Sequence, residues 1–174
     1  MNMIVAADSR WGIGRDNGLL ASLPTDMKYF REHTLGKVVV MGRKTLESLP
    51  GQKGLPKRTN IVLSANPDFE AKGCKVVHSE YELFDELAKY EPDDVFLIGG
   101  ASLYNRFYKY CRRLYITRMD ADLDADAFIV NIDEDENYSL VSESEPVTEN
   151  GITFRFLIYA RKTEGLNRAR TLKF

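Results

Sequence analysis

The sequence has few cysteines, little net charge and no long apolar run. Its two cysteines, Cys74 and Cys111, stand far apart, without the paired spacing of zinc sites or disulfide frameworks. We therefore expect two free, packed thiols, a reducing compartment and no metal site. The 24 basic and 26 acidic side chains leave a formal net charge of −2, so no overall field favours a nucleic-acid or membrane partner.

Neither a secretory signal nor a membrane helix is predicted at the start of the sequence. The segment MNMIVAADSRWG has no basic region, and its apolar stretch is too short to cross a bilayer. We therefore expect a cytoplasmic protein. The 174 residues, 44% apolar and 29% charged, fit one globular domain with a single core. We assign this domain to residues 1–162 and expect the basic residues 163–174 to form a solvated tail.

Short apolar segments rich in β-branched residues alternate with helical patterns along most of the chain. We predict strands at 3–7, 38–41, 60–63, 74–77, 95–98, 114–118 and 152–159. Helices are predicted around Asp26, from the GRKT segment to Leu49, at 81–90 and after Gly99-Gly100. Residues 139–143 can pair in antiparallel fashion with the last strand. The pattern predicts a single α/β domain: a central mixed, mainly parallel sheet flanked by helices, with an antiparallel C-terminal strand.

Three of the predicted strands end in segments suited to phosphate binding. VVVMGRKTLESL places a glycine, two cations and a hydroxyl at a helix start, and VFLIGGASLYNRF places two glycines and a serine there. NIVLSANP adds polar side chains at a third strand end. Each segment alone is equally consistent with a tight turn or a solvated helix end. Because the carboxyl ends of parallel strands meet at one edge, the three together favour one ligand with several phosphates.

The glycine-rich segment 12–18, GIGRDNG, is not a Rossmann dinucleotide fingerprint. Its third glycine is displaced, and no helix begins there, although the fingerprint requires a strand, a turn and a helix. This long loop before the next helix is better interpreted as a mobile cover over a site.

One carboxylate has an unusual position in the segment SLPTDMKYFR. Ser22 and Thr25 can each cap a helix, and Pro24 suits its first turn. Asp26 then shares a helical face with the aromatic residues three and four positions later, where an unpaired charge is costly. The simpler interpretation is a first-turn carboxylate that interacts favourably with the helix dipole.

Six segments, in this order, resemble the dihydrofolate reductase family from residue 1 to about residue 160: WGIGRDNG, LPTDMKYF, VVVMGRKTLESLP, LPKRTNIVLS, VFLIGGASLYNRF and LYITRMDADLDAD. The resemblance implies reduction of 7,8-dihydrofolate to 5,6,7,8-tetrahydrofolate for one-carbon metabolism. A hydride would pass from NADPH to C6 of the pterin, and a proton from water would reach N5. It also implies that antifolates such as methotrexate or trimethoprim bind, and that the protein is a monomer.

The resemblance assigns the polar substrate contacts to three side chains. Asp26 matches the acid that hydrogen-bonds the 2-amino group and N3 of the pterin, and Thr117 matches the threonine that supports this carboxylate. Arg58 matches the arginine that grips the glutamate α-carboxylate, a bidentate task for which lysine is a poor substitute. The apolar walls, floor and rim of the pocket are matched by Val5, Ala6, Met27, Phe30, Leu49 and Ile98.

The resemblance also implies an extended NADPH site. Arg43 and Ser64 would lie near the 2′-phosphate, and the Gly99-Gly100 bond is usually cis in the family. A flexible loop would close over the nicotinamide, and His78 falls where an adenine-side contact can occur. The matching positions are Ala7, Ile13, Gly14, Gly42, Arg43, Lys44, Thr45, Leu63, Ser64, Ala65, Gly99, Gly100, Ala101, Ser102, Leu103 and Tyr104.

The sequence departs from the common family pattern in three places. Leu19-Leu20-Ala21 replaces a usual Leu-Pro-Trp, so the indole that helps to hold a water near the pterin is missing. Residues 50–54 lengthen the loop before Leu55, and Ala125-Asp126 replaces a usual Gly-Asp. Two rival functions stay open: a riboflavin-pathway reductase of the same fold, which would bind a ribose phosphate, and a non-catalytic NADP-binding sensor.

Restoring the indole should act on the folate side of the site. We expect Ala21→Trp to change dihydrofolate or antifolate affinity more than NADPH affinity, because the indole N–H helps to place water near the pterin. Equilibrium titration of each ligand, monitored by protein fluorescence, measures the two changes. Equal changes in both affinities would contradict this assignment.

Overall fold

The computed structural model describes residues 1–162, and the predicted tail at 163–174 lies outside the described residues. Nine strands form the main sheet in this part of the chain. They are β1 (Asn2–Ala7), β3 (Val38–Gly42), β4 (Thr59–Leu63), β5 (Cys74–Val77), β6 (Val95–Gly99), β7 (Arg113–Met119), β9 (Tyr138–Glu143), β10 (Val147–Glu149) and β11 (Ile152–Arg161). A second, small sheet pairs β2 (Gly12–Gly14) with β8 (Ala127–Phe128).

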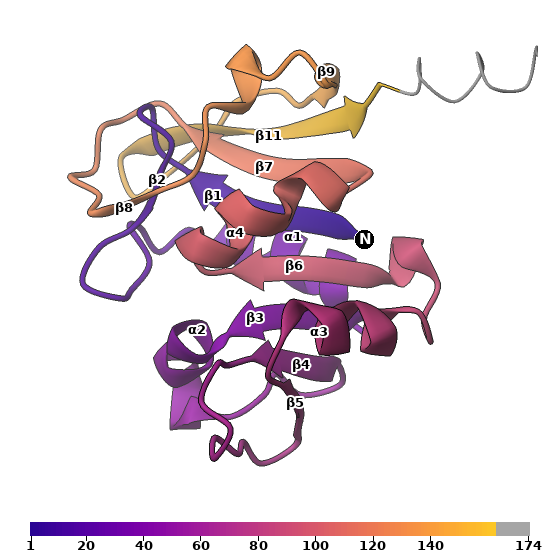
Figure 1. Cartoon of the computed structure of the whole chain (residues 1–174). Helices are drawn as coiled ribbons and strands as arrows, with labels where there is room; N and C mark the ends of the chain where they lie inside the picture. The colour runs from indigo at the N-terminus through magenta and orange to yellow at the C-terminus, as the bar shows by residue number, and fades with distance from the viewer. Residues whose placement is uncertain (163–174) are drawn as a thin grey trace, which may run out of the picture.

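The main sheet is mixed and mostly parallel, as the sequence predicts. Its order is β10-β11-β7-β1-β6-β3-β4-β5, and β9 pairs with β11 away from this path. All pairings from β7 to β5 are parallel, whereas β11 is antiparallel to β7, β9 and β10. The first strand of the chain therefore lies near the middle of the sheet, between β6 and β7 (Figure 1).

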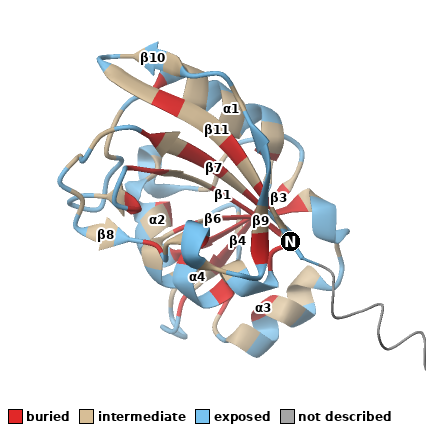
Figure 2. Cartoon of the chain, turned by 90° about the horizontal axis from the view of Figure 1, so that it is seen from above, coloured by how far each residue is buried: buried red, intermediate tan, exposed pale blue. Residues whose placement is uncertain are grey.

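Helices cover both faces of the sheet. They are α1 (Pro24–Thr34), α2 (Arg43–Ser48), α3 (Glu80–Leu87) and α4 (Ala101–Phe107), with short 3-10 turns at Pro50–Gln52, Pro92–Asp94, Tyr108–Tyr110 and Ile132–Glu134. Helices α3 and α4 lie on one face and α1 on the other (Figures 1 and 2). None of the helices in the described residues is long and apolar enough to cross a membrane.

The largest core cluster lies between the sheet and the α3–α4 layer. It contains fully buried side chains of the central strands and of α4, among them Leu97, Leu114, Ile116 and Phe107. Both cysteines are free, and Cys111 is buried in this cluster. Burial raises the pKa of the Cys111 thiol to about 12, so this sulfur packs as a neutral, apolar group.

Three local predictions need correction. The predicted helix at 81–90 is shorter, because α3 ends at Leu87, and the 12–18 loop contains the short strand β2. Neither Ser22 nor Thr25 caps α1: its N-cap residue is Leu23, whose apolar side chain makes no capping hydrogen bond. The Thr25 hydroxyl instead donates to Glu149 (2.5 Å), a residue far away in the sequence.

A fully buried carboxylate, that of Asp8, holds the start of the loop that leads into the glycine-rich segment 12–18. Asp8 accepts hydrogen bonds from the backbone N–H groups of Arg10 (2.9 Å), Gly12 (2.8 Å) and Leu123 (3.1 Å). Burying a carboxylate is favourable only when hydrogen-bond donors surround it, and these three bonds supply them. The Leu123 bond also joins the end of β1 to the acidic loop at 120–126.

The backbone at Gly12 leaves no room for a side chain. A Cβ there would lie 2.2 Å from the Ala125 Cβ and 2.9 Å from an Asp8 carboxylate oxygen. We expect Gly12→Ala to lower the free energy of unfolding by about 1–3 kcal/mol, because overpacking separates the two loops. Urea unfolding measures the loss. Gly18→Ala is the matched control, because the nearest atom to its new Cβ is 3.5 Å away, and an equal loss in both variants would contradict this interpretation.

Candidate active site

The carboxyl ends of the parallel strands meet at one edge of the sheet. Strands β1, β3 and β6 all point toward the side where α2 and β2 lie (Figure 1). Ligands of open α/β sheets bind at such an edge, beyond the strand ends. The predicted cofactor residues after β3, β4 and β6 are therefore brought to one side of the molecule.

Asp26 of α1 is hydrogen-bonded to the central sheet. Thr117 is buried (1% exposed), and its hydroxyl donates to Asp26 Oδ1 at 2.6 Å. In the strand register Thr117 pairs with Ala6 of β1. Burial raises the pKa of the Asp26 carboxyl, the Thr117 bond lowers it, and the charge of Glu149 raises it. Asp26 is therefore an ionisable group in a partly desolvated position.

Aromatic side chains lie beside this carboxylate. Tyr29, one turn after Asp26, stacks on Phe156 of β11 with ring centroids 4.0 Å apart. Burial is the main cause that raises the pKa of Tyr29 to about 12, so this phenol stays neutral. Phe30 is half-buried, whereas Met27 is 56% exposed.

The remaining apolar candidates fall into three packing groups. Leu49 and Ile98 pack against the same buried cluster, which contains Met41 and Leu46. Ala6 packs against the cluster of Leu23, Met119 and Phe154, and Val5 packs against the main core. Leu55 joins the group of Leu49 and Ile98, and sequence reasoning did not select it. Val5 and Ala6 belong to the second half of β1, and Ile98 is the residue before the end of β6, so these candidates lie near the carboxyl ends of two central strands.

Arg58 lies near a second arginine. Its Nε donates to the Thr34 hydroxyl (3.3 Å) and its Nη1 to the Pro56 carbonyl (2.8 Å). Partial burial, and then the charge of Arg31, lower the pKa of Arg58. Sequence reasoning missed Arg31, although its position one helical turn after Met27 could have indicated it.

The end of β6 lies tightly against α2. The Gly99-Gly100 peptide is cis, and a Cβ on Gly99 or Gly100 would lie 3.1 or 3.2 Å from the Thr45 hydroxyl oxygen. Arg43 is ion-paired with Glu47 (3.5 Å) on the surface of α2. Glycine at both positions therefore allows β6 and α2 to approach each other this closely.

The side chains that follow β4 and β6 are largely engaged with the protein itself. Ser64 is 8% exposed, and its carbonyl oxygen lies 2.9 Å from Nδ1 of His78. The buried Tyr104 hydroxyl donates to the Ile4 carbonyl at 2.8 Å, and burial raises the pKa of this phenol. Tyr104 therefore joins α4 to β1 as a neutral group.

Hydrogen bonds hold the glycine-rich segment 12–18 to two neighbouring parts of the chain. The N–H of Asp126 donates to the Gly14 carbonyl (3.0 Å), and the Asp126 carboxylate accepts from the N–H of Asp16 (2.9 Å). The Asn17 amide donates to the Lys44 carbonyl in α2 (3.2 Å). The segment thus connects the acidic loop to the start of α2.

A family model described as dihydrofolate reductase matches residues 1–161. The chain belongs to the dihydrofolate reductase family. It is 38% identical to a dihydrofolate reductase of Bacillus subtilis over 164 residues, which covers 93% of this chain and 95% of that protein. Identity to the Enterococcus faecium dihydrofolate reductase is 39% over 154 residues, covering 87% and 90%.

A solved structure of a family member has the same fold. Dihydrofolate reductase from Enterococcus faecalis, complexed with NADP(H) and the compound RAB-propyl, superposes with a TM-score of 0.83 at 33% identity. The match covers 92% of this chain and 95% of that one. The resemblance found in the six sequence segments is therefore confirmed over the described residues.

Burial of Asp26 gives its stability effect a definite sign. The pKa of Asp26 is higher in the folded chain than in the unfolded chain. Between these two pKa values the folded chain therefore binds more protons than the unfolded chain, and the free energy of unfolding falls as the pH rises through the folded-state pKa. We expect Asp26→Asn to be more stable than the wild type at pH 7 by about 1 kcal/mol. This advantage should shrink at acid pH, where the wild-type carboxyl is protonated.

Urea unfolding at a series of pH values measures this difference. Asp68→Asn, which replaces an exposed carboxylate by the same amide, is the matched control. An Asp26→Asn advantage that grows toward acid pH would contradict the assignment of a raised pKa.

Proposed function

We propose that the protein reduces 7,8-dihydrofolate to 5,6,7,8-tetrahydrofolate with NADPH. The observation that carries the proposal is the Asp26–Thr117 hydrogen bond, 2.6 Å long, in a chain whose residues 1–161 match the family. The similar structure from Enterococcus faecalis is that of an enzyme complexed with NADP(H), which supports this choice of cofactor. The product would supply one-carbon metabolism.

The residues at the strand ends fit a dinucleotide with phosphates. The bare backbone of Gly99 and Gly100 beside Thr45 suits close approach by a ligand, and Arg43 and Lys44 bring positive charge to the same region. Arg43 and Ser64 are proposed to select the 2′-phosphate, which distinguishes NADPH from NADH. When bound, NADPH supplies the hydride. The residues proposed to hold it are Ala7, Ile13, Gly14, Gly42, Arg43, Lys44, Thr45, Leu63, Ser64, Ala65, Gly99, Gly100, Ala101, Ser102, Leu103 and Tyr104.

Asp26 is proposed to hold the pterin and to favour its protonated form. The Asp26 carboxylate would accept hydrogen bonds from the 2-amino group and N3 of the pterin. The hydrogen bond from the Thr117 hydroxyl to Asp26 Oδ1 holds this carboxylate in one orientation. Partial burial strengthens the field of this charge at the pterin, which favours a proton on N5 and therefore a more electrophilic C6. Because Asp26 would contact the N3 side, water is the proposed donor of the N5 proton.

Arg58 is proposed to bind the α-carboxylate of the substrate's glutamate. Its guanidinium is held by the Thr34 hydroxyl and the Pro56 carbonyl, which limits the number of its rotamers. The nearby Arg31 adds a second positive charge at this end of the site. Val5, Ala6, Met27, Phe30, Leu49 and Ile98 are proposed to contact the rings between Asp26 and Arg58.

The same contacts support binding of antifolates, because diaminopyrimidine or pteridine rings present paired N–H donors to a carboxylate. We further propose that the enzyme acts as a cytoplasmic monomer. A size measurement in solution, with and without NADPH, tests the monomeric state.

Removal of the Asp26 charge tests the proposed mechanism. We expect Asp26→Asn to fold but to lose about 10²-fold or more in turnover at pH 7, because it removes the charge that favours N5 protonation. Activity should partly recover at low pH, where more substrate is protonated in solution. NADPH oxidation with dihydrofolate, followed by absorbance from pH 5 to 9, measures both effects.

Two further assays separate the rival functions. A riboflavin-pathway reductase would consume NADPH with a ribosylaminouracil substrate and not with dihydrofolate. A sensor would bind NADPH tightly without turnover and without competition by methotrexate. Full activity of Asp26→Asn at pH 7 would contradict the role given to this carboxylate.

A further inference from the structure

The first turn of α1 is anchored by a hairpin from the other end of the chain. The N-cap residue Leu23 provides no side-chain acceptor for the free N–H groups at the start of this helix. Glu149, the last residue of β10, supplies one instead. Its two carboxylate oxygens accept from the Thr25 N–H (2.9 Å) and the Thr25 hydroxyl (2.5 Å).

A second contact comes from the next residue of the hairpin. The Asn150 side-chain amide donates to the Ser22 carbonyl at 2.7 Å. Asn150 and Gly151 both have positive φ, 49° and 74°, and connect the paired residues Glu149 and Ile152. This is the geometry of a two-residue Asn-Gly hairpin turn, so the two anchoring side chains are presented by a short, well-defined connection.

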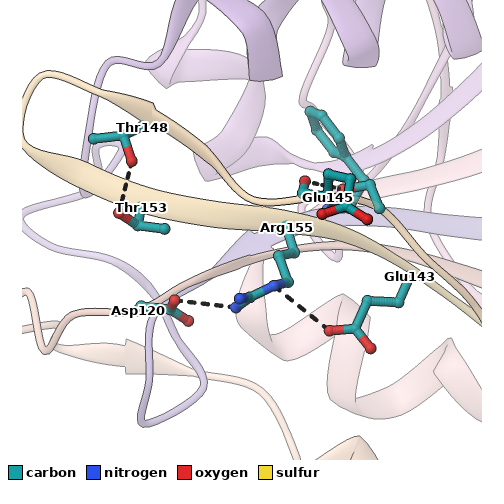
Figure 3. Close-up of polar contacts among 8 residues, drawn as sticks. Asp120, Glu143, Glu145, Thr148, Thr153 and Arg155 are labelled. Atoms are coloured by element: carbon teal, nitrogen blue, oxygen red, sulfur yellow. Dashed lines mark hydrogen bonds and ion pairs between the residues drawn. The ribbon is translucent and has the colours of Figure 1, made fainter.

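The hairpin itself is held firmly against the sheet. Figure 3 shows that the hydroxyl groups of Thr148 and Thr153 meet across the two strands, 2.8 Å apart. Arg155 of β11 is paired with Asp120 (3.2 Å) and with Glu143 (3.7 Å) (Figure 3). Glu149 is therefore carried by strands that are also held by contacts with each other and with Asp120.

Apolar packing joins the same two parts of the chain. Leu23, Met119 and Phe154 are buried together, and Ala21, Val147 and Ile152 pack against them. The segment before α1 and the β10–β11 hairpin thus form one unit. Asp26 follows Thr25 directly, so the carboxylate proposed to hold the pterin lies one residue from this anchor.

We propose that Glu149 is a positioning residue for Asp26: it fixes the first turn of α1 from the hairpin, and it places a negative charge at the pterin end of the site. This inference rests on the proposed function. The charge effect is supported by the raised pKa of Asp26, of which burial is the main cause and Glu149 a further one. The other titratable groups that interact with Asp26 are Tyr29 on α1 itself and Tyr104 in α4.

The charge of Glu149 has the same effect on the Asp26 carboxyl and on a nitrogen of the bound pterin. A nearby negative charge raises the pKa of a carboxyl and equally favours a proton on a pterin nitrogen. Removing the charge should therefore move the midpoint of the pH–rate profile to lower pH. At a pH above the midpoint the rate of hydride transfer should fall, and well below the midpoint it should not change.

Glu149→Gln separates the charge from the anchor. A glutamine can accept from the Thr25 N–H and donate to the Thr25 hydroxyl, so both contacts are retained while the charge is lost. We expect hydride transfer at pH 8 to be about threefold slower than in the wild type, the size of a partly screened charge effect, and unchanged at pH 5. Single-turnover NADPH oxidation with dihydrofolate, from pH 5 to 9, measures this.

Two variants serve as matched controls. Asn150→Gly keeps the turn but removes the bond to Ser22, and Glu145→Gln removes an exposed charge near the same hairpin. Both should retain the wild-type midpoint. Glu149→Ala, which loses the anchor as well as the charge, should show the glutamine variant's midpoint and a melting temperature about 2–4 °C below the wild type.

The outcomes distinguish this inference from the proposed function. A wild-type protein that does not oxidise NADPH with dihydrofolate would contradict the function itself. An active wild type with the same midpoint in Glu149→Gln would overturn the role of Glu149. An equal midpoint shift in Asn150→Gly would also overturn it, since loss of the mechanical anchor would then account for the change.

Discussion

The site depends on keeping one carboxylate, Asp26, partly buried and still ionisable. Burial disfavours its charged form, and the 2.6 Å bond from Thr117 favours it, so the carboxyl stands between two opposed effects. This balance requires α1 and β7 to lie close enough for the Asp26 carboxylate and the Thr117 hydroxyl to form a hydrogen bond. Neighbouring contacts meet this requirement: Leu23 is buried beside Phe154, and Tyr29 stacks on Phe156, both in β11.

The order of the strands explains how Thr117 and Gly99, from two different parts of the site, come to lie at one edge of the sheet. Strand β1 lies between β7, which carries Thr117, and β6, which ends at Gly99. The Ala6–Thr117 and Met41–Gly99 register pairs therefore bring the hydroxyl that binds Asp26 and the backbone of Gly99, proposed to contact the cofactor, to the same edge. Residues as distant in the sequence as Ala6 and Thr117 meet because a parallel sheet aligns its strand ends.

Local patterns in the sequence were sufficient for most strands and for the apolar face of α1, because alternation and helical spacing are properties of neighbouring residues. They were insufficient where a distant partner decides the structure. The cap of α1 comes from Glu149, 124 positions after Thr25, so Ser22 and Thr25 were wrongly chosen. Strand β2 has three residues, two of them glycines, and only its pairing with β8 defines it. Arg31 belongs to the site because it lies near Arg58, and the helical pattern alone does not predict this proximity.

The alanine at position 21 has a structural counterpart in the hairpin. Many family members place an indole before α1, and the sequence here offers instead a small side chain packed against Leu23 and Phe154. The segment is held by the Asn150–Ser22 bond and by Glu149, so anchoring does not require a large ring. Glu149 also places a negative charge beside Asp26, and this charge raises the pKa of the Asp26 carboxyl. In the proposed reaction the same charge favours a proton on the bound pterin, which makes C6 of the pterin a better hydride acceptor.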